Sequence, residues 1–391
     1  MKVNSLNKRF AFVTIVLFAF CSIFCTSGFS QAGARTEIKI PNIPGYITLK
    51  CDFHMHTVFS DGKVWPTIRP EEAWRQGLDA FAITDHIEYL PFKDDVRPNP
   101  NRSYEIAKPA AQALGLTIIR GAEITREMPP GHINSIFLQD ANALATKEWR
   151  DAVEAAIKQK AFVFYNHPGW QQPENKAVWH AEHTEMLEKG WLHGIEIVNG
   201  GDYYPLAHKW ALQKNLTILG NSDVHNPTGL DYNFYLGEHR SMTLVFAEEK
   251  TVEAIKQALF AQRTAVYWQN TLIGKAEYLN PIFEHSIQIV NPEVTLRGKG
   301  SANIQIHNKS EIDFLLSANG MVDELSFPQQ ITLHAGKTVL VKISGKSGSL
   351  SGEKKIRIPY IVKNLLIAPE KHLRAALAID VNFVPTEREN N

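Results

Sequence analysis

The sequence predicts an α/β barrel followed by a small all-β domain, and three observations support this fold class. From Leu49 to about Ala247, short apolar runs alternate with amphipathic helical patterns, which is typical of βα units around a parallel sheet. Seven or eight such units favour a closed barrel, because a closed ring of strands covered by helices has no exposed edge. After Asn270 the helical periodicity ends, and regular short strand-like runs predict a β-sandwich.

The predicted barrel contains strands and helices in alternation. Its strands are expected at Leu49–His56, Ala80–Thr84, Leu116–Thr125, Ile133–Leu138, Ala161–Asn166, Ile195–Val198, Leu216–Gly220 and Met242–Phe246. Its helices are expected at Pro70–Gly77, Tyr104–Leu114, Glu148–Lys158, Glu185–Lys189, Leu206–Lys214 and Val252–Gln262. Pro70 suits a first helical turn, because the backbone N–H groups there have no intrahelical partner. Pro109 is expected to interrupt or bend its helix.

The all-β region has its own set of predicted strands, separated by Gly, Asn, Ser and Lys turns. These strands are Ser286–Val290, Ala302–His307, Phe314–Ser317, Gln330–Leu333, Thr338–Ile343, Lys355–Val362 and Ala376–Phe383. The junction is placed between residues 275 and 285. We therefore expect a barrel domain over 35–275 and a β-sandwich domain over 280–391.

Residues 1–34 have the pattern of a signal peptide. Three basic residues come first, Phe10 to Phe24 form an apolar core, and Ala32-Gly33-Ala34 is a small-residue cleavage site. A membrane anchor fits less well, because the apolar run is short of the roughly 20 residues of a spanning helix. We therefore expect export and cleavage before Arg35, and a periplasmic or secreted mature protein without a stable membrane anchor.

Charge and cysteine content narrow the class of protein. The chain has 41 basic and 41 acidic residues without a basic stripe, so a nucleic-acid groove is not favoured. Removal of residues 1–34 takes away three basic residues and no acidic one, which leaves 38 basic against 41 acidic residues. Only Cys51 then remains, which excludes an intrachain disulfide. A small substrate is the favoured partner, and the sequence carries no signal for an oligomeric state.

The stretch from Cys51 to Gly62 contains the first chemical motif. Side chains alternate along a strand, so His54 and His56 are expected to face the same side. The turn residues that follow could fold the carboxylate of Asp61 back over the strand end. A His-x-His pair alone is more often two hydrogen-bonded histidines in a strand, so the other strand ends decide whether this is a metal site.

Potential metal ligands occur at or near the other predicted strand ends, where a βα barrel carries its functional groups. With the first motif, these residues are His54, His56, Asp61, His86, Glu123, His132, His167, Asp223 and His225. Nine ligands are too many for one ion, since zinc takes about four and octahedral ions about six. We therefore expect two or three clustered divalent ions, with Glu123 able to bridge. Imidazole and carboxylate without thiolate suit Zn, Mn or Fe.

These motifs, in this order, resemble those of the PHP family, named for polymerase and histidinol phosphatase, over roughly residues 48–270. The resemblance implies a distorted seven-stranded, TIM-like βα barrel that holds three metals. It implies three ligand sets: His54, His56, Glu123 and Asp223; Asp61, His86 and His225; and Glu123, His132 and His167. Some relatives have histidine at the position of Asp61, so this residue bears on which metal is bound.

The chemistry that the resemblance implies is hydrolysis at phosphorus by a metal-bound hydroxide. Glu123, Asp223 and His225 are the ligands to which we also assign a catalytic role. Candidate phosphate contacts are Lys93, Arg126 and Arg240, each of which is equally well explained as a solvated surface charge.

Four further residues flank the motifs. Trp65 and Trp170 could form a wall for a leaving group, although ordinary aromatic packing explains them equally well. Glu196 and Asn199 are expected to be hydrogen-bond partners of ligating histidines. Asp85 is expected to lie outside the ligand set.

The leading hypothesis is an exported, multinuclear metal-dependent phosphoesterase that hydrolyses small phosphomonoesters or phosphodiesters. Export argues against the intracellular biosynthetic and polymerase roles of the family. The β domain is similar to the extra domain of secreted PHP-type phosphodiesterases, which favours diesters slightly. One alternative is an amidohydrolase-like enzyme that attacks carbonyl carbon. Another is a non-catalytic protein whose β-sandwich binds a glycan or partner, against which the complete ligand set argues.

Overall fold

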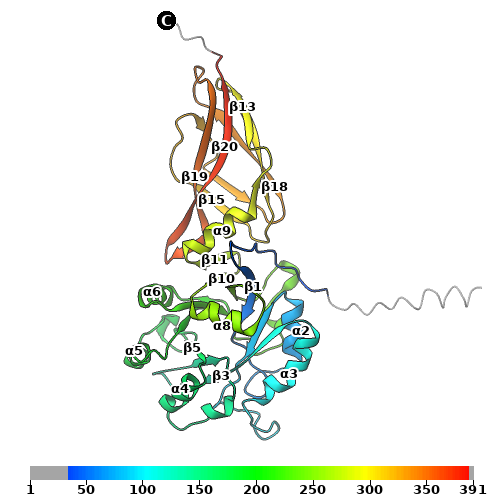
Figure 1. The fold of residues 1–391 in the computed structure, drawn as a ribbon, viewed down its shortest axis with the longest axis vertical. Coiled ribbons are helices and arrows are strands. Elements are labelled where there is room, and N and C mark those ends of the chain that lie inside the picture. The colour runs from blue at the N-terminus through cyan, green and yellow to red at the C-terminus, as the bar shows by residue number, and fades with distance from the viewer. Residues whose placement is uncertain (1–33, 387–391) are drawn as a thin grey trace, which may run out of the picture. The chain divides into compact units, whose positions relative to one another are not determined.

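A computed structural model describes residues 34–386 (Figure 1). The predicted signal peptide, except for its last residue, lies outside the described residues. Within 34–386, no helix combines the length and apolar character needed to cross a bilayer.

The N-terminal part of the described chain is a mixed α/β domain. All eight predicted strands are present within a few residues of their expected bounds: β1 Ile47–Asp52, β2 Ala80–Ile83, β3 Thr117–Ile124, β4 Ile133–Ile136, β5 Phe162–Tyr165, β6 Gly194–Asn199, β8 Thr217–Asn221 and β9 Met242–Ala247. Three more were not predicted: β7 Asp202–Tyr203, β10 Thr264–Trp268 and β11 Thr271–Gly274. The apolar runs of the sequence thus correspond to buried strands.

Helices lie around the outside of these strands (Figure 1). They are α2 Ile68–Arg75, α3 Arg102–Ala113, α4 Trp149–Lys158, α5 Ala181–Glu188, α6 Pro205–Lys214, α7 Thr228–Asp231 and α8 Val252–Phe260. Short 3-10 turns occur at Ala141–Leu144, Pro173–Asn175 and Phe234–Leu236. Thr251 caps α8, because its hydroxyl accepts a hydrogen bond from the N–H of Ala254. Pro109 lies inside α3 without ending it.

The strands do not form the predicted ring of parallel strands. Neighbouring strands follow the order β11-β10-β9-β1-β2-β3-β4-β5-β6, with β8 also beside β6. Strand β4 runs antiparallel to β3 and β5, and β9 runs antiparallel to β1 and β10. Residues 125–132, between β3 and β4, are too few for the crossover that a parallel pair needs. The all-parallel prediction is therefore wrong, and the domain is a mixed sheet.

Among residues 34–386, no backbone ladder joins β8 to β9 or β10, and no closed barrel is formed. Side-chain hydroxyls connect them instead. The hydroxyl of Thr243 lies 3.0 Å from the N of Gly220 and 2.9 Å from its O, and Thr264 donates to the O of Ile218 at 2.9 Å. A Cβ at Gly220 would lie 2.3 Å from Val266 Cγ1, so only glycine permits this close packing. These contacts hold the end of β8, directly before Asp223.

The C-terminal part is an all-β domain of two sheets. Its strands are β12 Ile287–Ile289, β13 Glu293–Arg297, β14 Ser301–Asn308, β15 Phe314–Ala318, β16 Leu325–Ser326, β17 Gln330–Leu333, β18 Thr338–Gly345, β19 Gly352–Ala368 and β20 Lys371–Val384. One sheet has the order β12-β14-β18-β16, and the other contains β13-β20-β19 with β15 and β17. All seven predicted strands are present. The long β19–β20 hairpin dominates the second sheet (Figure 1).

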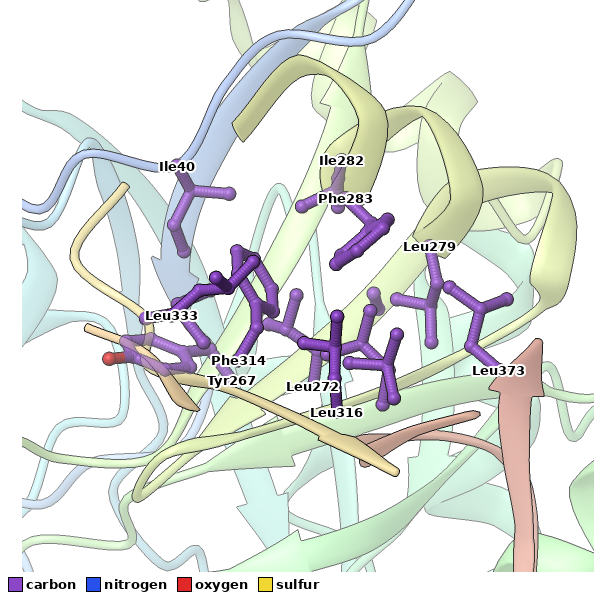
Figure 2. Packing of buried hydrophobic residues seen from close by; sticks show 14 of the residues in the cluster. Ile40, Tyr267, Leu272, Leu279, Ile282, Phe283, Phe314, Leu316, Leu333 and Leu373 are labelled. Carbon is purple, nitrogen blue, oxygen red and sulfur yellow. The ribbon is translucent and has the colours of Figure 1, made fainter. Parts of the chain in front are cut away.

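The junction between the two parts contains a helix, α9 Ala276–Ser286, so the prediction that helices end after Asn270 is wrong. The side chains of Leu279, Ile282 and Phe283 lie beside Phe314 and Leu316 of the β domain in one apolar cluster (Figure 2). This packing explains why an isolated helical segment sits in an otherwise strand-rich region.

Strand pairing also crosses the junction. Strand β11 pairs in parallel with β19, with Leu272 opposite Leu365 and Ile273 opposite Leu366. One sheet and one apolar cluster therefore include residues of both parts.

Candidate metal centre

His54 and His56 lie just after β1, not inside it, because β1 ends at Asp52. The backbone nevertheless stays extended beside the segment that follows β8. The N–H of His56 donates to the O of Val224 at 3.1 Å, and the N–H of Asp223 donates to the O of His54 at 2.9 Å. Alternation is therefore kept, and the two buried rings lie side by side with centroids 5.1 Å apart.

Glu123 is the centre of the cluster. It is fully buried near the end of β3. Its carboxylate oxygens lie within 3.5 Å of ring nitrogens of five histidines, which are His54, His56, His86, His132 and His167. Oε2 faces the first three and Oε1 the last two. A carboxylate whose two oxygens face different histidines can bridge two cations.

Two further carboxylates complete the cluster. Asp223 Oδ1 lies 3.1 Å from His54 Nε2 and 3.0 Å from His56 Nε2. Asp61 Oδ1 lies 3.2 Å from His225 Nε2 and 3.5 Å from His86 Nε2. Asp61 and His225 retain 22% and 31% side-chain exposure, so this side of the cluster is the most open to solvent.

The nine predicted ligands form four overlapping groups, each with ligand atoms within 4.8 Å of one another. The groups are His56, Asp61, His86 and His225; His54, Glu123 and His167; His54, His56 and Asp223; and His86, Glu123 and His132. The structure thus brings all nine residues together. The three ligand sets implied by the family resemblance match these groups only partly. His56 also belongs to the group that contains Asp61, and His132 and His167 belong to different groups.

Four ligand atoms are buried without an aligned hydrogen-bond partner among the described residues. They are His56 Nε2, Asp61 Oδ1, His132 Nδ1 and Asp223 Oδ1. An unsatisfied buried polar atom costs about 1–3 kcal/mol. Cations among these atoms would satisfy all four, and a set of imidazoles and carboxylates without thiolate suits borderline divalent metals. The donor set therefore fits several divalent ions.

Opposite charges shift the pKa values of these ligands strongly. Burial lowers the pKa of His54, but Asp223, Glu196 and Glu123 outweigh it and raise the pKa well above its usual range. Burial raises the pKa of Glu123, but neighbouring histidines led by His86 hold it well below its usual range. Protons on the histidines therefore compete with cations for the same positions, so metal affinity should fall in acid.

Glu196 was expected to be a hydrogen-bond partner of ligating histidines, and it bonds two of them. Its Oε1 accepts from His54 Nδ1 at 2.9 Å, which directs His54 Nε2 toward the cluster. Its Oε2 accepts from the backbone N–H of His167 at 2.8 Å and from Asn199 Nδ2 at 2.9 Å. Asn221 donates to Oε1 at 2.9 Å. Every bond to Glu196 thus fixes a residue at or beside the cluster.

Asp85 organises the loop between His56 and Asp61. It accepts hydrogen bonds from the backbone N–H of Thr57 at 2.6 Å, from the Thr57 hydroxyl at 2.8 Å and from the Ser60 hydroxyl at 2.8 Å. It therefore supports the loop and does not face the cluster as a ligand.

The predicted phosphate contacts lie elsewhere. Arg240 is fully buried, where its Nη1 bonds Asp52 at 3.0 Å and its Nε bonds Gln76 at 2.6 Å, so its predicted role in substrate binding is wrong. Its charge and position in the chain did not reveal that it points into the core. Arg126 pairs with Glu88 at 2.8 Å, and Lys93 is exposed on a loop.

An open cavity of about 510 Å³ lies over the cluster. It is lined by Asp61, His86, Tyr89, Thr125, His132, His167, Trp170, Gln171, Asp223 and His225. Of the two tryptophans considered as a wall, Trp170 lines the cavity and Trp65 does not. Tyr89, Thr125 and Gln171 were missed. The spacing offers a signal that could have found Tyr89, because Tyr89 and Trp170 each follow a histidine ligand by three residues.

The fold and this donor set define a mixed α/β domain with a candidate multinuclear metal centre, joined to an all-β domain. Residues 52–189 match the PHP domain, and residues 287–378 match an Ig-like domain. A two-domain protein from Bacteroides vulgatus, which contains a predicted PHP-like metal-dependent phosphoesterase, is 43% identical. The match covers 89% of this chain and 100% of that one, with a TM-score of 0.84. The chain therefore belongs to the PHP family, in a form with a C-terminal Ig-like domain.

A more distant relative is an uncharacterized protein from Methanocaldococcus jannaschii. It is 26% identical over 193 residues, which are 46% of this chain and 84% of the relative.

Proposed function

We propose that this protein is a metal-dependent phosphoesterase that hydrolyses small phosphomonoesters or phosphodiesters. One observation carries the proposal: nine histidine and carboxylate side chains, Glu123 among them, gather beside an open cavity large enough for a small ester. When bound, divalent ions at such a site polarise phosphoryl oxygens and lower the pKa of a coordinated water. Zn, Mn and Fe are the proposed metals, and two or three ions the proposed number.

The chain's own residues prepare the ligand atoms for this role. The backbone O of Asp223 can only accept, so His225 Nδ1, at 2.8 Å, donates to it. The other ring nitrogen, Nε2, lies 3.2 Å from Asp61 Oδ1, where a cation would replace its proton. His54 is fixed in the same way, because Nδ1 donates to Glu196. In both histidines Nδ1 is thus engaged in a hydrogen bond, which leaves Nε2 as the atom for a cation.

The charge of the site favours an anionic substrate. Three carboxylates and three dications would together leave a charge of about +3 beside the cavity. Asp61 and His225, the most exposed ligands, mark the side from which a phosphate group can approach. Glu123, Asp223 and His225 are the residues that we propose to be catalytic as well as ligating.

The test is to reconstitute the purified chain with Zn, Mn or Fe and to measure its metal content together with hydrolysis of a panel of phosphomonoesters and phosphodiesters. His54→Ala and Asp223→Ala should each abolish turnover. The matched controls are His334→Ala and Asp202→Ala, which change residues outside the cluster. Unchanged activity in both cluster variants would refute the proposal. Turnover of cyclic amides but not of phosphate esters would replace it with an amidohydrolase-like function.

We also propose that the protein is exported, on the basis of the signal-peptide pattern in residues 1–34. The mature chain would begin at Arg35 and act in the periplasm or outside the cell. N-terminal sequencing of the protein recovered from the periplasm or the medium should begin at Arg35. A full-length chain retained in the cytoplasm would contradict export.

A further inference from the structure

Two large aromatic side chains line the cavity and remain exposed. Tyr89 is 54% exposed and Trp170 is 43% exposed. The ring of Trp170 lies 4.7 Å from that of His132 and 5.3 Å from that of His167, and the ring of Tyr89 lies 5.8 Å from that of His86. Both rings are therefore next to the ligand cluster. Apolar surface exposed in a concave site is typical of ligand-binding pockets.

The position of Trp170 is held by its own loop. Its backbone N–H donates to the O of His167 at 2.9 Å, which closes a turn directly after that ligand. The neighbouring Gly169 is packed so closely that a Cβ there would lie 2.2 Å from the O of Asn175 and 2.6 Å from the ring of Tyr204. The loop that supplies a ligand thus also presents the indole to the cavity.

The cavity lining in the described chain contains no lysine or arginine. Four lining residues are not predicted ligands, and these are Tyr89, Thr125, Trp170 and Gln171. The hydroxyl of Thr125 is already bonded to His86 Nδ1 at 2.6 Å. A second phosphate or carboxylate on a substrate would therefore find no lysine or arginine in the lining.

We propose that Tyr89 and Trp170 form the leaving-group subsite and that it takes a planar, uncharged aromatic or heteroaromatic ring. This inference rests on the proposed phosphoesterase function and specifies its substrate class. The substrate carries one phosphoryl group at the ligand cluster, and its ring packs against the exposed aromatic faces in an offset or edge-to-face arrangement. Sugar phosphates and esters with a second anionic group are poorer substrates.

The experiment compares four phosphomonoesters of primary alcohols, so that leaving-group reactivity stays similar. They are benzyl, cyclohexylmethyl, methyl and 2-carboxyethyl phosphate. Wild-type protein should have the highest kcat/KM with benzyl phosphate, roughly two- to tenfold above cyclohexylmethyl phosphate, because aromatic pairs contribute beyond their buried area. 2-Carboxyethyl phosphate should be no better than methyl phosphate.

Variants then assign the preference to the two rings. Trp170→Ala and Tyr89→Ala should each lower kcat/KM for benzyl phosphate by about tenfold, mainly through KM, and change methyl phosphate less than twofold. Trp170→Phe should restore most of the preference. Trp65→Ala is the matched control, since Trp65 is 48% exposed and packs against Phe59 outside the cavity lining.

Two outcomes would overturn the inference while leaving the phosphoesterase function intact. One is an unchanged ratio of benzyl to cyclohexylmethyl hydrolysis in both alanine variants. The other is an equal loss for all four esters, with loss of metal, which would make the aromatic residues supports of the cluster. Hydrolysis of no phosphate ester by the wild-type protein would instead refute the proposed function itself.

Discussion

A buried asparagine of the Ig-like domain and the buried ligand cluster of the α/β domain differ in how their polar atoms are satisfied. In the described part of the Ig-like domain, Asn308 is buried with its partners inside the chain: its Nδ2 donates to the O of Ile312 and of Leu333, and its Oδ1 accepts from Ser310. In the α/β domain, buried ligands such as His56 and Asp223 leave ring and carboxylate atoms without aligned partners. Asn308 thus needs no further partner, whereas the unpaired atoms of His56 and Asp223 lie in groups that could hold a metal ion.

This difference in hydrogen bonding distinguishes buried groups that stabilise the fold from buried groups that are available to bind a ligand. A buried network in which every polar atom is hydrogen-bonded stabilises the folded state. A buried cluster with unpaired polar atoms lowers the stability of the folded state until a bound ligand satisfies those atoms. The mixed sheet and the hydroxyl contacts of β8 position this cluster.

The largest expected effect is the loss of activity on substitution of Glu123. Glu123→Gln keeps the shape of the side chain but removes the charge that faces five histidines. Loss of an outer hydrogen bond to a ligand costs about 10–100-fold in metal affinity or activity, so loss of the central carboxylate should cost more than roughly a hundredfold in kcat/KM. Bound metal per chain should fall as well, by elemental analysis of the same sample.

Asn308→Ala is the contrasting change in the Ig-like domain. It should lower the free energy of unfolding by about 1–3 kcal/mol, because it leaves buried groups unsatisfied, and leave kcat/KM unchanged. Full activity in Glu123→Gln, or inactive but stable Asn308→Ala protein, would contradict the proposed division between the domains.

The next effect is on the free energy of unfolding and concerns helix α9, at the junction between the two domains. Phe283→Ala removes a buried ring of α9 that packs with Phe314 at a centroid distance of 5.1 Å. We expect a loss of about 3–5 kcal/mol in the free energy of unfolding, measured by urea denaturation. Because β11 also pairs with β19, both domains should unfold in one transition. A second transition, with the α/β domain unaffected by the substitution, would show that the domains are energetically separate.

The smallest effect concerns stability in acid, to which the buried His183 of the α/β domain should contribute. Burial lowers the pKa of His183 to about 4, and the fixed tautomer agrees with a neutral ring: Nδ1 accepts from the N–H of His180 and Nε2 donates to the O of Pro130. The folded-state pKa is below the unfolded value, so this contribution to stability is complete above about pH 6.5 and is lost as the pH falls toward 4.

His183→Gln measures this contribution. Between pH 7 and pH 5, the wild-type protein should lose about 2 kcal/mol more unfolding free energy than the variant, since one pKa unit corresponds to about 1.4 kcal/mol. Both proteins share the ligand cluster, so protonation of the ligands cancels in the difference. Equal losses in the two proteins would mean that His183 is charged in the folded state.

Much of the local structure could be predicted from the sequence. The eight apolar runs of the first region are strands, and the seven runs of the second region are strands as well. The ligands were visible because histidines and carboxylates are distinctive where they follow buried strands. Helix α9 was missed because its apolar positions, among them Leu279 and Phe283, face a partner domain that no local pattern reveals.

The direction of a side chain or strand was harder to predict. Arg240 follows a ligand-bearing loop, yet it is buried against Asp52. Strand β4 has the composition of its neighbours but runs the opposite way. Neither the residue type nor the spacing specifies these outcomes.

The sequence by itself determined which residues form the candidate metal centre, since His54-Met55-His56, Glu123 and Asp223-Val224-His225 are defined by residue type and by position after apolar runs. Only the tertiary structure decided that Glu123 lies among five histidines and that Trp170, not Trp65, lines the cavity. The physical reason is the distance along the chain over which each kind of interaction acts. Periodicity and turn residues act over a few neighbours, whereas the contacts of Glu123 with His54 and His167, 69 and 44 positions away, depend on how strands and helices pack together.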